Sequence, residues 1–156
     1  MVLKADSYYK AEIKKIFIEN WHTDFMISKG KKHFVEDLEA LIYLENDTIK
    51  GLLTYCIEEN KLEIVSLDSF EENKGIGSLL IQEIVNIFQL SGVDQLWLIT
   101  TNDNVDALRF YQKRNFSISA LYKDAITKAR KIKPSIPLLG YNNIPLRHEI
   151  ELIYNQ

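Results

Sequence analysis

The stretch LEIVSLDSFEENKGIGSLL, from Leu62 to Leu80, decides the fold of this chain. Its first part is a short run rich in residues that favour β-structure, and we expect a strand over residues 61–67. Its last part begins with Gly75 and Gly77 and continues into apolar residues spaced three and four apart, which predicts a helix from Gly75 to near Gly92. The stretch therefore predicts a strand, a short loop and a helix with a glycine-rich start.

The glycines at the start of this helix predict a site for an anion. The N–H groups of a first helical turn have no partner within the helix, and glycine lets a phosphate approach them closely. A dinucleotide fingerprint needs a glycine where Leu80 stands, and a P-loop needs Gly-Lys where the chain has Lys74-Gly75. We therefore expect a phosphate-bearing ligand of another kind, with a plain tight turn as the alternative.

The rest of the sequence predicts strands and helices in alternation. Strands are expected over residues 2–4, 41–45, 48–57, 95–100, 116–122 and 149–154, and helical segments from residue 7 to before Trp21, over 104–114 and over 124–131. The strands from 41 to 67 predict an antiparallel meander, because only tight turns separate them. Residues 24–38 have no clean period, with Gly30 as a break, and residues 134–145, which contain all three prolines, predict a loop.

Length and composition exclude several classes of protein. A chain of 156 residues with 46% hydrophobic and 26% charged residues is expected to fold as a single domain over residues 1–156. A net charge of −3 argues against nucleic acid as a partner. One cysteine, Cys56, excludes an internal disulfide and any multi-cysteine metal site, and the sequence has no signal segment or long apolar run. We expect a cytoplasmic protein that does not bind membranes.

A second motif, TTNDNVDALRFYQKRNF, runs from Thr100 to Phe116. The two motifs together resemble the signature of the GNAT superfamily of acyl-CoA-dependent N-acyltransferases. In that family Gln/Arg-x-x-Gly-x-Gly/Ala follows one strand, and Asn-x-x-Ala-x-x-Phe-Tyr follows the next. The resemblance covers residues 61–116 and extends to a tail similar to that of small, poorly characterised bacterial members. Glu72 departs from the usual Gln or Arg, and Asn115 replaces the usual Gly before Phe116.

The resemblance implies an α/β fold of the α+β kind. We expect a mixed, mostly antiparallel sheet of six to seven strands flanked by helices, splayed between strands 4 and 5 (residues 61–67 and 95–100) to admit acetyl-CoA. The implied activity is transfer of acetyl from acetyl-CoA to a primary amine of a small molecule, by direct attack in a ternary complex. The alternatives are a protein or peptide amine as acceptor, or a non-catalytic acyl-CoA-binding module, which Glu72 favours. The oligomeric state stays open, with a homodimer as one option.

The same resemblance assigns the residues of the site. The backbone of Leu67 and Ser69 is expected to align the pantetheine arm, and Asn104 to bond it from the other side. Tyr111 is expected beside the thioester sulfur, as the acid that returns a proton to the departing thiolate. The amides expected to hold the pyrophosphate belong to Asn73, Lys74, Gly75, Ile76, Gly77 and Ser78, and Lys74 is expected to offset the charge of Glu72. No metal is expected.

The sequence leaves the general base open. An alkylamine with a lysine-like pKa of about 10.4 is almost fully protonated at pH 7, so a base or a water relay must take its proton. Glu63 is the first candidate, because alternation along the strand puts it on the face of Val65 and Leu67. Asp68, on the opposite parity, is the second candidate. The alternative for Glu63 is a carboxylate that faces solvent.

The remaining reactive side chains are expected to be structural. His22, His33 and His148 are dispersed and lack metal-ligand spacing, so we expect them at the surface or in hydrogen bonds. Cys56 lies within an apolar strand and is expected to be a buried small hydrophobe. Trp21 suits either an acceptor pocket or plain packing.

Overall fold

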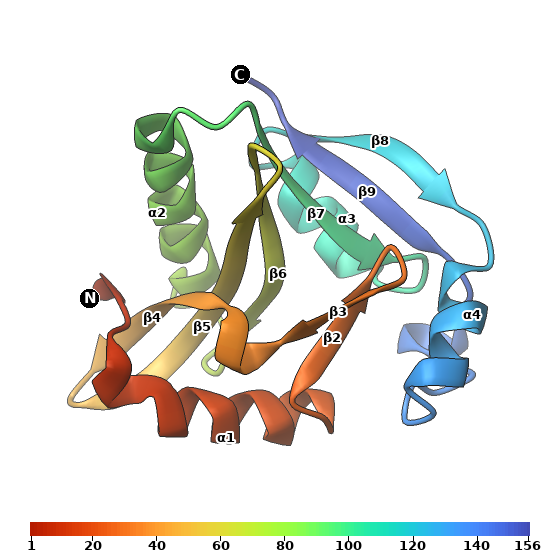
Figure 1. Cartoon of the computed structure of the whole chain (residues 1–156), viewed down its shortest axis with the longest axis horizontal. Helices are drawn as coiled ribbons and strands as arrows, with labels where there is room; N and C mark the ends of the chain where they lie inside the picture. Colours follow the sequence, from red (N-terminus) through yellow and green to blue (C-terminus); the bar gives the residue numbers. More distant parts are fainter. The chain divides into compact units, whose positions relative to one another are not determined.

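The computed structural model describes residues 1–156, which form two compact units (Figure 1). The first unit contains residues 1–26 and 33–96, and the second contains residues 27–32 and 97–156. None of the helices combines the length and the apolar composition that a membrane span requires. A single domain over residues 1–156 stays a prediction.

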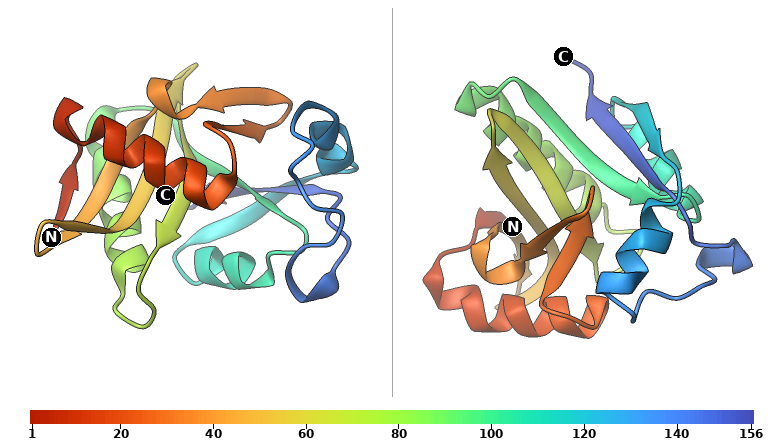
Figure 2. Two further views of the ribbon diagram at one scale, coloured as in Figure 1. Left: turned by 90° about the horizontal axis from the view of Figure 1, so that it is seen from below. Right: turned by 45° about the vertical axis from the view of Figure 1, so that its right-hand side comes forward.

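The first unit is an antiparallel set of strands between two helices. Its strands follow the order β1 (Val2–Lys4), β4 (Glu39–Glu45), β5 (Thr48–Glu58) and β6 (Lys61–Ser69). Helices α1 (Lys10–Trp21) and α2 (Ile76–Ser91) cover opposite faces of these strands (Figure 2). Phe17 of α1 packs with Leu52, whereas a Cβ added to the neighbouring Gly51 would approach Ile76 and Leu80 of α2. The predicted meander and the helix ending at Gly92 are confirmed.

A short hairpin occupies the region that the sequence left irregular. Strands β2 (Phe25–Ser28) and β3 (Lys31–Phe34) pair with each other, and Lys29 and Gly30 form the turn with φ angles of 51° and 79°. The buried positions of the two strands are Ser28 and His33, which are polar. A hydrophobic period is therefore absent here. Two short 3₁₀ helices in the first unit, η1 (Ser7–Tyr9) and η2 (Val35–Asp37), precede α1 and β4.

The second unit contains three antiparallel strands and three helical segments. Strand β9 (Glu149–Tyr154) lies between β7 (Gln95–Thr101), which begins at the boundary of the units, and β8 (Phe116–Tyr122). Its helices are α3 (Val105–Gln112), α4 (Ala125–Ile132) and the 3₁₀ turn η3 (Tyr141–Asn143). Asn115, which stands where the family motif has Gly, has a φ of 70° and adopts the left-handed conformation that is common after a helix.

A β-bulge interrupts the regular pairing of β6. Ser66 pairs with Thr54, and Ile64 pairs with Tyr55, so Val65 is an extra residue on β6 without an opposite partner on β5. An extra residue exchanges the two faces of the strand beyond it, because side chains alternate with a period of two. The bulge therefore determines which side chains of β6 share a face.

The prediction that Glu63 shares the face of Leu67 is wrong for this reason. Glu63 pairs with Cys56 and Asp68 pairs with Leu52, two positions that lie on the α1 face of β5. Leu67 pairs with Leu53 on the other face. The two candidate bases, which the sequence placed on opposite faces, thus lie on the same face of β6.

Candidate cofactor and active site

Helix α2 begins directly after Gly75, whose carbonyl accepts the Leu79 N–H at 3.1 Å. The N–H groups at the start of a helix have no acceptor in a preceding helical turn. Asn73 and Gly75 have φ angles of 60° and 71°, and left-handed residues in a loop turn nearby N–H groups toward a common point. The backbone of residues 73–78 thus has the features of an anion site, and its role in binding pyrophosphate stays a prediction.

The charged side chains of this loop pair with one another. Glu71 receives ion pairs from Lys74 at 2.8 Å and from Lys50 at 2.9 Å, and these two hydrogen bonds lower the pKa of Glu71. The hydrogen bond with Glu71 in turn raises the pKa of Lys74. Glu72 is exposed and makes no hydrogen bond or ion pair. Lys74 is therefore paired with Glu71, and the expectation that it offsets Glu72 does not hold.

The end of β6 is fixed against the start of α2. The Ser69 hydroxyl donates to the Glu71 carbonyl at 2.9 Å, and Ser69 pairs with Gly51 of β5. A Cβ added to Gly51 would lie 2.5 Å from Cγ2 of Ile76, so only glycine permits the helix to begin this close to β5. This packing holds the backbone of Leu67 and Ser69 at a fixed distance from the first turn of α2.

Trp21 and Asp68 form a hydrogen bond on the α1 face. The Trp21 indole Nε1–H donates to the Asp68 carboxylate at 3.1 Å, and no basic side chain lies within ion-pair distance of that carboxylate. Burial raises the pKa of Asp68 to about 6, and the bond from Trp21 only partly opposes this effect. Trp21, which the sequence left between pocket and packing, is thus a polar partner of the second candidate base.

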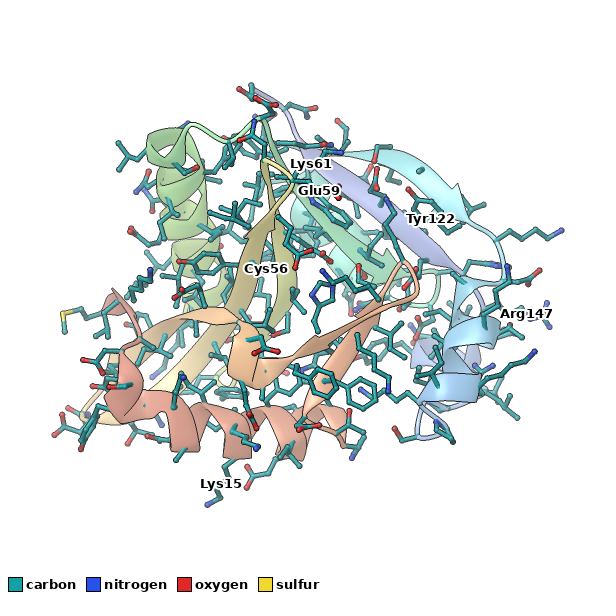
Figure 3. The ribbon with its side chains drawn as sticks, in the orientation of Figure 1. Lys15, Cys56, Glu59, Lys61, Tyr122 and Arg147 are labelled. Atoms are coloured by element: carbon teal, nitrogen blue, oxygen red, sulfur yellow. The ribbon has the colours of Figure 1, made fainter.

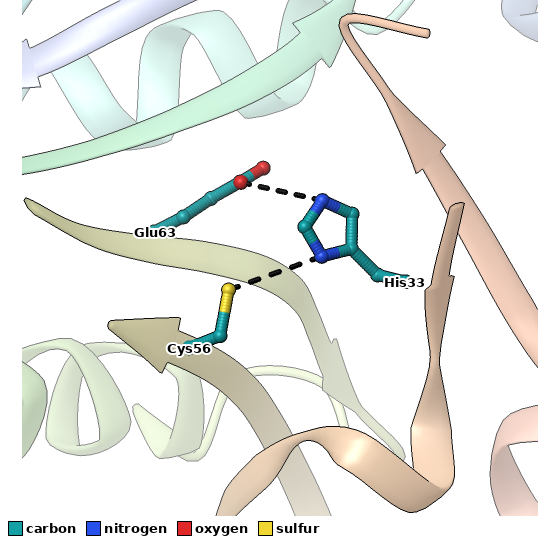
Figure 4. Close-up of side chains that lie close together, drawn as sticks. All are labelled: His33, Cys56 and Glu63. Atoms are coloured by element: carbon teal, nitrogen blue, oxygen red, sulfur yellow. Dashed lines mark hydrogen bonds and ion pairs between the residues drawn. The ribbon is translucent and has the colours of Figure 1, made fainter. Parts of the chain in front are cut away.

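Glu63 lies in a cluster with His33 and Cys56 (Figure 4). His33 Nε2 is 3.5 Å from Glu63 Oε1, and Cys56 Sγ is 3.9 Å from His33 Nδ1. Glu63 and His33 are each only 6% exposed, so Glu63 does not face solvent. Cys56 lies among the strands in Figure 3, whereas Lys15 of α1 points to solvent. Cys56 is half-buried beside an imidazole, so the expectation of a plain hydrophobe is wrong.

The other predicted site residues belong to the second unit. The Asn104 side-chain oxygen accepts the Ala107 N–H at 3.1 Å and caps α3, so its NH₂ group is the part left for a ligand. Tyr111 is 8% exposed, and its ring meets Phe110 and Phe116 edge-on, with ring centres 5.2 Å and 5.5 Å away. The capping role of Asn104 explains why this residue type stands at the start of α3, whether or not a ligand binds.

Asp103 is a structural residue that the sequence did not single out. It is 2% exposed, accepts hydrogen bonds from the Thr101 hydroxyl and from the Tyr141 N–H, and leaves no room for a side chain at Gly140. It therefore ties the proline-containing loop of residues 134–145 to the end of β7. An aspartate two residues after a strand is too common a pattern to have revealed this role.

Lys29 is a second residue whose role the sequence did not predict. Its ammonium group lies 5.1 Å from the centre of the Trp97 ring, 5.0 Å from that of Tyr122, and 3.3 Å from the Glu151 carboxylate. Its backbone N–H donates to Glu149 at 3.1 Å. The hydrogen bond with Tyr122, and to a lesser extent Glu151, raises the pKa of Lys29. The turn of the β2–β3 hairpin is thereby anchored within the second unit.

Comparisons with known proteins agree on one family. Residues 7–116 match the model of the acetyltransferase (GNAT) family. The chain is 41% identical over 142 residues to the uncharacterized protein YxbD of Bacillus subtilis (strain 168), covering 90% of this chain and 89% of that one. An IAA acetyltransferase from Bacillus cereus ATCC 14579 superposes with a TM-score of 0.78 at 20% identity, over 100% of this chain and 99% of that one. A GNAT family acetyltransferase from Elizabethkingia anophelis with acetyl-CoA bound gives 0.71 at 20% identity, over 100% and 97%. These superpositions confirm the predicted fold class.

Proposed function

Because the chain belongs to the acetyltransferase (GNAT) family, we propose that it transfers an acetyl group from acetyl-CoA to the primary amine of a small molecule. The start of α2 is the observation that carries the proposal. Its left-handed Asn73 and Gly75 turn the backbone N–H groups of the helix start toward a common point, where they can donate to a pyrophosphate. The structure from Elizabethkingia anophelis, a protein of similar fold, was solved with acetyl-CoA bound.

The proposed reaction is direct attack of the amine on the thioester. The amine nitrogen forms a bond to the acetyl carbon, the bond from that carbon to sulfur breaks, and the thiolate of coenzyme A leaves. The amine loses a proton to a base, and Tyr111 returns one to the thiolate, since a tyrosine with a pKa of about 10 can protonate a thiolate of about 8.5. Asn104 would hold the pantetheine arm through its free NH₂ group.

Glu63 is the base that we propose, in preference to Asp68. Glu63 stands beside a buried imidazole that can hold its carboxylate in one orientation, whereas Asp68 has only the Trp21 indole as a partner. A pKa of about 6 leaves most of Asp68 ionised at neutral pH, so Asp68 stays the second candidate and the contact with His33 is what favours Glu63.

Calorimetry with acetyl-CoA, followed by a thiol-release assay over an amine panel, tests this function. The panel should contain alkylamines, amino acids and a lysine-containing peptide. Release that depends on a small amine supports the proposal, whereas release with the peptide alone favours a protein acceptor. Binding of acetyl-CoA without release by any amine argues for a binding module.

Gly77→Val tests the anion site directly. A side chain at the second residue of α2 would crowd a phosphate, so we expect the affinity for acetyl-CoA to fall by about tenfold or more. Gln82→Val, on an exposed position of the same helix, is the matched control, because it adds the same β-branched residue away from the first turn. An affinity for acetyl-CoA that is equal in the two variants contradicts the proposed site.

A further inference from the structure

His33, Cys56 and Glu63 form a cluster of three titratable side chains, and only Glu63 takes part in the proposed reaction. Three strands bring these residues together: β3 supplies His33, β5 supplies Cys56 and β6 supplies Glu63 (Figure 4). Their ligand atoms lie within 4.8 Å of one another, a spacing that also suits a metal ion. The choice between a metal site and a hydrogen-bonded relay depends on which atoms of the imidazole face the two neighbours.

The orientation of the imidazole favours a relay. The Cys56 sulfur faces Nδ1 at 3.9 Å, and the Glu63 carboxylate faces Nε2 at 3.5 Å. The two ring nitrogens point in divergent directions, and one metal ion can bind only one of them, so chelation would require one neighbour to move to the other side of the ring. An ionised carboxylate can only accept, which assigns the ring proton to Nε2 and leaves Nδ1 to accept the thiol proton.

We propose that His33 is a positioning residue for the general base Glu63. The Nε2–H of His33 donates to Oε1 of Glu63, holds the carboxylate in one rotamer and supports its charge in a buried place. The second carboxylate oxygen then accepts the proton of the amine. Cys56 fixes the tautomer of His33 through its bond to Nδ1 and carries no acetyl group. This proposal rests on the proposed function, since it concerns the base of that reaction.

Cys56 and Glu63 face His33 from the neighbouring strands β5 and β6. On its own strand, Lys31 and Lys32 are exposed. Removal of the imidazole therefore removes the donor that the structure gives to Oε1 of Glu63. Loss of a hydrogen bond to a charged group makes that charged form less stable, so activity should then fall off at a higher pH on the acidic side of the profile.

Two substitutions of His33 separate positioning from packing. His33→Leu keeps much of the volume and removes the donor, and His33→Gln places an amide N–H near the position of Nε2. We expect kcat of His33→Leu to fall about tenfold or more, with the KM for acetyl-CoA unchanged and the acidic limb moved to higher pH. We expect His33→Gln to recover most of kcat. His22→Asn is the control, because Asn tolerates the left-handed backbone of His22.

A measurement that does not depend on enzyme activity tests this proposal separately from the proposed function. Long-range ¹⁵N–¹H spectra of the full chain should show the proton of His33 on Nε2, and Glu63→Gln should change that spectrum. A proton on Nδ1, or equal kcat in His33→Leu and His33→Gln, overturns the positioning role even if the enzyme is active. Absence of acceptor-dependent thiol release in the wild type, with the Nε2 tautomer present, contradicts the proposed function instead.

Cys56→Ala tests the part assigned to the thiol. We expect kcat to fall less than in His33→Leu, because the ring keeps its bond to Glu63, and we expect no acetyl adduct on Cys56 after the wild type is incubated with acetyl-CoA alone. Loss of all activity in Cys56→Ala, together with an acetyl adduct on the wild-type cysteine by intact-protein mass spectrometry, overturns the proposal in favour of a thiol that carries the acetyl group.

Discussion

Tyr111 is held by aromatic rings on two sides, and its hydroxyl is the group that the proposed reaction uses. Tyr111→Phe keeps the edge-on contacts with Phe110 and Phe116, so the folded structure should be preserved. We expect kcat to fall by about 10²-fold, because a positioned acid contributes about 10²–10⁴-fold, while the affinity for acetyl-CoA stays within about twofold. Steady-state kinetics and calorimetry check the two quantities. Unchanged turnover removes Tyr111 from the reaction.

Asp68 should make stability depend on pH. Burial raises its pKa from 3.8 to about 6, so the folded protein holds this proton more tightly than the unfolded chain does. Its stabilising contribution is therefore complete below about pH 4 and is lost as the pH rises through about 6. Each pKa unit corresponds to about 1.4 kcal/mol, so the loss amounts to roughly 1–3 kcal/mol.

Asp68→Asn tests this dependence. The amide oxygen can still accept the Trp21 indole N–H but carries no charge. We expect the free energy of unfolding of the variant, relative to the wild type, to increase between pH 5 and pH 8 by about 1.4 kcal/mol. Urea denaturation at the two pH values measures it, with Asp47→Asn in an exposed turn as the control. If the difference in the free energy of unfolding between the variant and the wild type does not change with pH, the raised pKa of Asp68 is contradicted.

At the scale of elements, the start of α2 depends on Gly51 of β5. A Cβ at this position would lie 2.5 Å from Ile76 and 3.1 Å from Leu80. Gly51→Ala should displace the first turn of α2 and lower the free energy of unfolding by about 1–3 kcal/mol, as overpacking does. Because the displaced turn carries the proposed anion site, the affinity for acetyl-CoA should fall as well. Thr48→Ala, at an exposed position of the same strand, is the control. Equal affinities for acetyl-CoA in the two variants would contradict a role of the helix start in binding.

The elements that the sequence predicted are those with strong apolar periods. Helix α2 has a clear apolar period, the strands of the meander are short apolar runs separated by turn residues, and Asn115 follows the end of α3 with a left-handed backbone that few other residues adopt. The β2–β3 hairpin was missed because its buried positions are occupied by Ser28 and His33. The bulge at Val65 was missed because one extra apolar residue in a strand leaves no trace in composition.

The sequence predicted one part of the candidate site and missed another, because only the first part has a local sequence pattern. The backbone of residues 73–78 was identified because glycine and helix-start chemistry are local in sequence. His33, Cys56 and Glu63 lie on three different strands, and the strand of His33 has no hydrophobic period. Their spacing along the sequence therefore does not indicate that they lie together. Counting in twos from Leu67 misplaced Glu63, because the bulge lies between them.

At the scale of the whole molecule, the residues assigned to the coenzyme come from two distant parts of the sequence, Gly75 and Gly77 from one and Asn104 and Tyr111 from the other. A ligand that binds only the folded chain stabilises it by about 2.7 kcal/mol at a hundred times its Kd. For a chain of this size each kcal/mol raises Tm by about 2–4 °C, so we expect a rise of about 5–10 °C with saturating acetyl-CoA. Differential scanning fluorimetry measures it.

Hydrogen exchange can locate the part of the chain that acetyl-CoA stabilises. We expect acetyl-CoA to slow exchange of amides in the first turns of both α2 and α3, because each helix start is assigned a contact with the coenzyme. At the same concentration of acetyl-CoA, Gly77→Val should reduce the rise in Tm by about half or more and weaken the protection in α2. Protection confined to α3 would place the coenzyme away from the glycine-rich turn.

The extra residue at Val65 divides β6 into two segments of opposite phase. Before it, odd-numbered positions face α1, and after it the even-numbered positions do. If residues are transplanted from a related strand that lacks this insertion, the side chains of one segment would therefore point to the wrong face of the sheet. The side chains of the other segment would keep their faces. Attempts to redesign the acceptor preference should replace residues on only one side of Val65 at a time. The alternation of side chains should be counted separately on each side of that residue.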